Sequence, residues 1–281
     1  MKFCHVCLVI LSVCAVSAYG RQTGTNISLG TAGAFGVLAG STVTNTGPTV
    51  INGDVGVFPG SVVTGFPPGS VTPPGSIYTN DGIAQQAQND LTTAYNLAAG
   101  ETGGSNLSGQ DLGGLVLTPG VYTFSSSAQL TGLLTLNDLG NPNADFVFQI
   151  GSTLTTASGS SVVFSNGLDD NVFWQVGSSA TLGTTTDFSG NILANTSITL
   201  NTGANIGCGS ALAENGAVTL DTNTISTDGA SGCQTASGGI VPEPGTGLLF
   251  ATGPLLGLLL LGWRSKRFGQ YALNHIANAA R

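Results

Sequence analysis

The chain has 281 residues, enough for one or two domains, and 43 of them are glycine. Only 7% of the residues are charged, the net charge is −8, and residues 22–263 contain no Lys, Arg or His. Without cations this stretch has no means to neutralise phosphates, which excludes nucleic-acid and nucleotide binding. It also lacks the imidazole or amine base of nucleophilic catalysis and the histidines typical of zinc sites.

The first 18 residues have the pattern of a secretory signal peptide. Lys2 precedes an apolar run over residues 6–16, and small residues lead to a cleavage position after Ala18. We therefore predict that residues 1–18 are a signal peptide and that residues 22–239 form one exported domain.

Most of this domain consists of short apolar-alternating runs separated by Gly, Asn and Ser, which predicts many short strands and tight turns. One segment differs, because apolar residues recur at helical spacing from Ile83 to Ala98. Thr79 or Asn80 can cap the start of this segment, and Gly100 can end it. We predict one amphipathic helix over residues 80–99, whose small alanine-rich face suits close packing beside a sheet.

The second half of the domain repeats itself irregularly in length but regularly in order. Five short runs begin at residues 129, 153, 179, 197 and 217, each preceded by a longer apolar run and usually followed by a third. A period of about 20 residues indicates a solenoid. Three short strands per turn, stacked coil on coil, predict a mainly β protein built as a β-helix.

Alternation along these second runs separates inward from outward side chains. We align Leu130, Leu154, Leu182, Leu200 and Leu220 as inward residues, which leaves one outward threonine at every coil. Since neighbouring strands lie ~4.8 Å apart and residues i and i+2 ~6.7 Å apart, the face is a flat, uncharged lattice of hydroxyls and methyls that can order water like ice. The candidate site residues are Thr42, Thr44, Thr131, Thr153, Thr155, Ser179, Thr181, Ser197, Thr199 and Thr219.

Several longer motifs resemble the ice-binding proteins of bacteria, yeasts, fungi and sea-ice algae over roughly residues 27–230. The resemblance implies a right-handed, discontinuous β-helix of triangular section with one long α-helix alongside, and ice adsorption on one flat face. The chain departs from strong ice binders at Gln129 and Ala217. The motifs are residues 35–47, 52–56, 90–95, 117–122, 172–177 and 212–221.

Other interpretations of the domain stay open. Thr is common in strands, so the threonines are also compatible with plain solvated surface, and the same fold suits a structural or adhesive matrix module without ice activity. No enzyme is predicted, because a glycosidase needs paired carboxylates in one groove and the aspartates are scattered. Four turn aspartates have oxygen ligands suited to Ca²⁺, but turn aspartates usually cap their own backbone, so we predict no metal and no cofactor. They are Asp138, Asp145, Asp169 and Asp170.

Two cysteines, Cys208 and Cys233, remain in the exported domain. Two cysteines in an oxidising compartment are most simply explained as a disulfide. A metal or catalytic role would require partner residues that this stretch does not contain.

The C-terminal part has the pattern of a membrane anchor. Residues 241–244 read Val-Pro-Glu-Pro, residues 245–263 are uncharged, and Arg264, Lys266 and Arg267 follow. We predict a transmembrane helix over residues 245–263, an outward-facing domain and a cytoplasmic tail over residues 268–281. Residues 240–267 resemble the PEP-CTERM sorting signal of bacteria with exopolysaccharide-producing envelopes, which implies cleavage near residues 242–244. The long tail departs from that pattern, so two alternatives stay open: secretion after cleavage, or a permanent membrane anchor. The predicted partners are ice, the membrane and exopolysaccharide.

Overall fold

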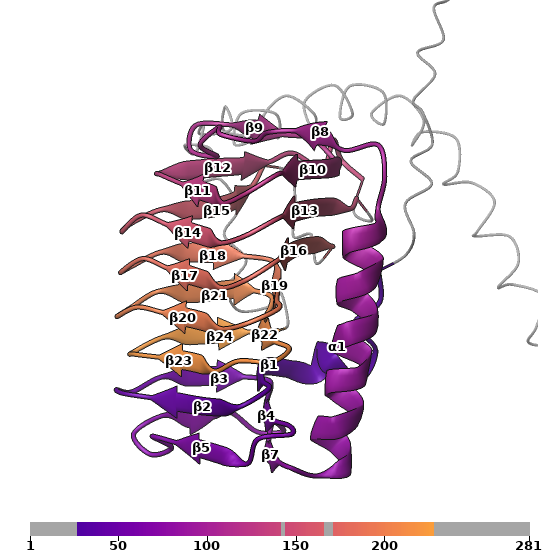
Figure 1. The fold of residues 1–281 in the computed structure, drawn as a ribbon. Coiled ribbons are helices and arrows are strands. Elements are labelled where there is room, and N and C mark those ends of the chain that lie inside the picture. The colour runs from indigo at the N-terminus through magenta and orange to yellow at the C-terminus, as the bar shows by residue number, and fades with distance from the viewer. Residues whose placement is uncertain (1–26, 142–143, 166–170, 228–281) are drawn as a thin grey trace, which may run out of the picture. The chain divides into compact units, whose positions relative to one another are not determined.

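The computed structural model describes residues 27–141, 144–165 and 171–227, which form a β-solenoid of about eight turns with three parallel sheets and one helix (Figure 1). The chain divides into residues 1–236 and 237–281, and every described residue belongs to the first unit. The predicted signal peptide (1–18), sorting signal (240–267), transmembrane helix (245–263) and tail (268–281) lie outside the described residues. Within the described ranges, no helix has the length and apolar character needed to cross a bilayer.

A complete turn of the solenoid contributes one strand to each of the three sheets, and the turns at the two ends are incomplete. We name the sheets A, B and C and give their strands in spatial order. Sheet A contains β7 (Ile77–Thr79), β4 (Asp54–Val57), β1 (Phe35–Ala39), β22 (Ala211–Ala213), β19 (Asn191–Ala194), β16 (Val172–Val176), β13 (Phe146–Ile150), β10 (Gly120–Phe124) and β8 (Ser105–Asn106). Sheet B contains β11 (Ala128–Leu130), β14 (Leu154–Thr156), β17 (Ala180–Leu182), β20 (Ile198–Leu200), β23 (Val218–Leu220), β2 (Thr42–Asn45) and β5 (Val62–Thr64). Sheet C contains β6 (Ser70–Val71), β3 (Val50–Asn52), β24 (Thr224–Ser226), β21 (Asn205–Cys208), β18 (Asp187–Ser189), β15 (Ser161–Phe164), β12 (Leu133–Leu136) and β9 (Val116–Leu117).

The described chain begins partway along the solenoid rather than at one end. A short 3₁₀ helix (Gly30–Ala34) leads into the coil β1 to β3, and β4 to β7 complete one end. Helix α1 (Gly82–Gly100) then runs along sheet A to the opposite end, from which β8 and later strands wind back (Figure 1). The last coil therefore pairs with the first, with Val43 opposite Val218 in sheet B.

Helix α1 confirms the predicted helix, with differences at its start. The N-cap is Asp81, not Thr79 or Asn80, and its Oδ1 accepts hydrogen bonds from the backbone N–H of Ile83 (3.1 Å) and Ala84 (2.8 Å). Ile83, placed by the prediction on the packed face, is 51% exposed because it lies one residue before the buried stripe. That stripe, which packs on the outer surface of sheet A, consists of Ala87, Leu91, Ala94 and Ala98, with Ala84 buried in the first turn.

Asp81→Ala is expected to lower the free energy of unfolding by about 1 kcal/mol, because two N–H groups of the first helical turn lose their acceptor. Chemical denaturation of the two proteins measures the difference. Asp81→Asn keeps a side-chain oxygen at the cap, so its loss should be smaller. An equal loss from Asn80→Ala would show that the cap is assigned to the wrong residue.

Stacked aromatic side chains fill the solenoid interior at one end. Tyr122, Phe148 and Trp174 occupy paired positions on β10, β13 and β16. Their ring centroids lie 5.4 Å apart for the first pair and 3.8 Å for the second, and Trp174 Nε1 donates a hydrogen bond to the Ser189 carbonyl oxygen (3.0 Å). This in-register pairing confirms the repeat that the longer apolar runs predicted.

Candidate functional site

The outward surface of sheet B carries one continuous row of side chains. Its inward residues are buried as predicted, which turns the alternate residues to solvent. The buried set includes Leu130, Leu154, Leu182, Ile198, Leu200, Val218 and Leu220. We name the paired outward residues the central file; in spatial order they are Gln129, Thr155, Thr181, Thr199, Thr219, Thr44 and Thr64.

The structure places Thr131 outside the central file. The proposed alignment set Leu130 against Leu154, whereas Leu130 pairs with Thr156, so that Gln129 stands in the file beside Thr155. Thr156 takes an inward position because its hydroxyl is hydrogen-bonded there, to the Thr186 hydroxyl (2.8 Å) and the N–H of Gly183 (2.8 Å). Apolar alternation alone does not detect a buried threonine of this kind.

Thr131 instead follows β11 and binds Asp111. Its N–H and hydroxyl donate to the two carboxylate oxygens of Asp111, at 2.9 and 2.8 Å. Burial alone would raise the pKa of Asp111, but these bonds and one from the Gly113 N–H outweigh it and hold the pKa below its ordinary value. The backbone of Asp111 also forms an isolated parallel β-bridge with Gln129. An ionised carboxylate therefore lies beyond the Gln129 end of the central file.

Thr64 extends the central file by one coil and was missed by the sequence analysis. Strand β5 pairs with β2, which places Thr64 opposite Thr44 and Val62 opposite Thr42. Part of the signal was present, because Val-Thr at 63–64 repeats Val-Thr at 43–44.

A second row lies two residues before the central file, and we name it the flanking file. It comprises Ser127, Thr153, Ser179, Ser197, Ala217, Thr42 and Val62. Several of its hydroxyls bind the next coil: Thr153 Oγ1 donates to Ser127 Oγ (2.8 Å). The Oγ atoms of Ser179 and Ser197 accept from the N–H groups of Ser197 (3.3 Å) and Ala217 (3.2 Å). The flanking file therefore joins neighbouring coils.

The central file differs from the flanking file in its hydrogen bonding. None of its six threonine hydroxyls bonds to another atom of the described residues. Parallel pairing holds successive threonines ~4.8 Å apart on a rigid sheet, over roughly 29 Å for seven strands. The face therefore offers solvent a regular row of unused hydroxyls and methyls without a charged group in it.

The turn aspartates do not gather into a metal site in the described part of the chain. No group of three His, Cys, Asp or Glu side chains meets in the three described ranges. Asp138 accepts a hydrogen bond from the N–H of Gly140 (2.9 Å), as a turn-capping residue does. Burial, and to a smaller extent the charge of Glu101, raises the pKa of Asp145. Asp169 and Asp170 lie outside the described residues.

Cys208 is buried at the end of β21 and is disulfide-bonded. Cys233 lies outside the described residues, so the pairing of these two cysteines stays a prediction. In protein that lacks residues 1–18, we expect no alkylatable thiol until a reductant is added, as measured by mass spectrometry after denaturation. In Cys233→Ser, Cys208 should become alkylatable. Two alkylated thiols in the unreduced parent protein would contradict the pairing.

Comparison with known proteins places this architecture in one family. Residues 37–226 match the family model described as Ice-binding-like. The chain is 58% identical over 255 residues to an ice-binding protein of Nostoc sp. (strain HG1), covering 89% of this chain and 93% of that protein. The crystal structure of an ice-binding protein from the Antarctic ascomycete Antarctomyces psychrotrophicus is 43% identical, with a TM-score of 0.69, over 73% of this chain and 99% of that one. An ice-binding protein from an Antarctic biological consortium is 50% identical, with a TM-score of 0.68, over 72% and 90%. The chain belongs to the ice-binding-like family.

Proposed function

We propose that this protein binds ice through the outward face of sheet B and thereby limits the growth and recrystallisation of ice. The observation that supports the proposal is the row of six in-register threonines whose hydroxyls have no partner among the described residues. The relatives that share the fold are named as ice-binding proteins.

The mechanism follows from how the two files use their hydroxyl groups. The flanking file keeps neighbouring coils in register, and the central file presents hydroxyls and methyls at the repeat of the sheet. Water molecules that bond to such a row are held at the spacing of the strands. Because the sheet is rigid, these water molecules are already ordered when they join an ice surface. The proposed contact residues are Thr44, Thr64, Thr155, Thr181, Thr199 and Thr219, flanked by Thr42, Thr153, Ser179 and Ser197.

Growth of single ice crystals in dilute purified protein tests the proposal. Ice binding restricts growth on selected crystal planes, so we expect faceted crystals and a measurable gap between melting and freezing temperatures. Smooth disc-shaped growth with no such gap would overturn the proposal and favour a structural or adhesive matrix module.

We also propose that the protein is exported and is then either released after C-terminal cleavage or held at the cell surface. The features that support this are the signal-like residues 1–18 and the PEP-CTERM-like residues 240–267, with the membrane and exopolysaccharide as the partners that the second resemblance implies. Terminal sequencing of protein from the medium and from the envelope fraction tests both cleavages. An uncleaved N-terminus would contradict export by this route, and an intact C-terminus in every fraction would indicate a permanent anchor.

The family resemblance further implies right-handed coils around a triangular section. A right-handed sense agrees with the usual handedness of connections between parallel strands. An experimental structure of the exported domain checks both features.

A further inference from the structure

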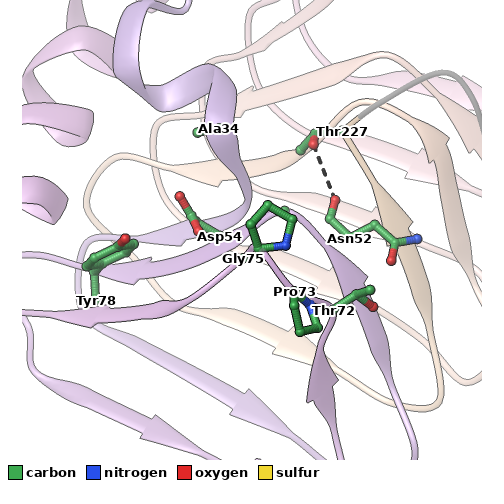
Figure 2. Close-up of a pocket in the computed structure, with 10 residues that line it drawn as sticks. Ala34, Asn52, Asp54, Thr72, Pro73, Gly75, Tyr78 and Thr227 are labelled. Atoms are coloured by element: carbon green, nitrogen blue, oxygen red, sulfur yellow. Dashed lines mark hydrogen bonds between the residues drawn. The ribbon is translucent and has the colours of Figure 1, made fainter.

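A cavity of about 510 Å³ lies where sheet C turns into sheet A, near the end of the solenoid that β4 to β7 complete. Figure 2 shows its lining: Tyr78 and Asp54 lie on one side, Asn52, Thr72 and Thr227 on the other, with Pro73 and Gly75 between them. The volume falls within the ~300–1,000 Å³ range of small-molecule sites.

One wall of the cavity is a corner that is longer than the corner of the adjacent coil. A single glycine, Gly53, joins β3 to β4, and Gly190 alone joins β18 to β19. Between β6 and β7 the corner has five residues, Thr72-Pro-Pro-Gly-Ser76, which form one wall of the cavity. This corner therefore has four more residues than the adjacent corner between β3 and β4.

This longer corner is held in place by hydrogen bonds. The Gly75 N–H donates to the Thr72 carbonyl oxygen (3.0 Å), and the Ser76 N–H donates to Asp54 Oδ1 (2.8 Å). The two prolines have fixed φ angles and restrict the wall further. The cavity wall is therefore largely formed before any ligand enters.

Several polar groups at the cavity have no partner among the described residues. The side-chain amide of Asn52, the hydroxyl of Thr72 and the phenol of Tyr78 make no hydrogen bond there, and Asp54 uses only its Oδ1 atom. Apolar surface lies beside them. The Tyr78 ring packs on Phe35 at a centroid distance of 5.8 Å, and Pro73 and Pro74 also line the cavity.

We propose that this cavity binds a neutral saccharide. The chain has no Lys, Arg or His over residues 22–263, so nothing here compensates the charge of a phosphate, sulfate or uronic acid, and Asp54 repels it. A single carboxylate is too few ligands for a divalent cation. A hexose presents hydroxyl groups that alternate with apolar C–H surfaces. Its hydroxyls can bond to the free carboxylate oxygen, the amide and the two hydroxyls of the cavity. Its C–H surfaces can pack on the aromatic and proline rings beside them.

The saccharide site is separate from the proposed ice-contacting face. It lies between sheets C and A, whereas the central file lies on sheet B. Occupation of one site leaves the other uncovered, so the protein can hold a polysaccharide and an ice surface at once. This proposal does not depend on ice binding.

Calorimetric titration of the purified exported protein with cellotriose, maltotriose and laminaritriose tests the site. At least one of these neutral sugars should bind, and trigalacturonic acid should bind at least about tenfold more weakly. Asp54→Ala should weaken binding of the same neutral sugar about tenfold, because a hydrogen bond to a charged group is lost. Thr72→Ala should weaken it less.

Matched variants separate this proposal from the others. Asp187→Ala removes an exposed carboxylate on the outer surface of sheet C and should leave sugar affinity unchanged. Asp54→Ala should keep full ice-shaping activity and a parent-like circular dichroism spectrum, and Thr181→Tyr should keep full sugar affinity. The absence of binding by all three neutral sugars overturns the proposal. Equal affinity of parent and Asp54→Ala, or equal binding of trigalacturonic acid, also overturns it.

Discussion

Thr181→Tyr is expected to abolish the shaping of ice crystals while changing the melting temperature of the protein little. Thr181 lies inside the central file, paired with Thr155 on one side and Thr199 on the other. A tyrosine ring there holds the surrounding face away from a flat ice surface, so the neighbouring hydroxyls lose their contact as well. Its side chain points outward, and changes at such positions usually alter stability by no more than ~0.5 kcal/mol.

Two further variants make this prediction specific to sheet B. Thr199→Lys introduces a flexible charge at the next strand and should have the same effect as Thr181→Tyr. Thr224→Tyr places the same bulk on an exposed position of β24 in sheet C and should leave the gap between melting and freezing temperatures unchanged. The assignment of the face fails if both sheet B variants keep full activity, or if only the Thr224 variant loses it.

Trp174→Ala is expected to lower the free energy of unfolding by about 3–5 kcal/mol, the range for a large aromatic side chain removed from a core. Trp174 is fully buried between Phe148 and Phe188, at centroid distances of 3.8 and 4.9 Å. Alanine leaves a cavity between these rings, and the Ser189 carbonyl oxygen loses its donor. Urea denaturation followed by far-ultraviolet circular dichroism measures the loss.

Two comparisons show whether that loss comes from the core. Trp174→Phe keeps a ring in the stack and removes only the indole N–H and part of the volume, so it should cost less than Trp174→Ala. Ile83→Ala removes an apolar side chain that is 51% exposed and should change stability by no more than ~0.5 kcal/mol. A cost below 1 kcal/mol for Trp174→Ala would contradict the packing described for this stack.

The sequence by itself determined the local features of this protein. The absence of Lys, Arg and His from residues 22–263 is read directly from composition, and it limits both the possible chemistry and the possible ligands. Alternation identified the inward residues of sheet B, such as Leu182 and Leu200, because in a strand one face must be apolar. Spacing at 3.6 residues identified helix α1 in the same way.

Only the tertiary structure decided which residues of different coils lie side by side. Thr131 and Thr155 occupy similar places in their own runs, but Gln129 is the residue beside Thr155. That register depends on the buried hydrogen bonds of Thr156, which no apolar pattern reveals. The pairing of the first coil with the last also joins segments more than 170 residues apart, such as Val43 and Val218. Alternation and helical spacing are properties of neighbouring residues, whereas register between coils is set by packing across the whole core, and so it appears only when the chain is folded.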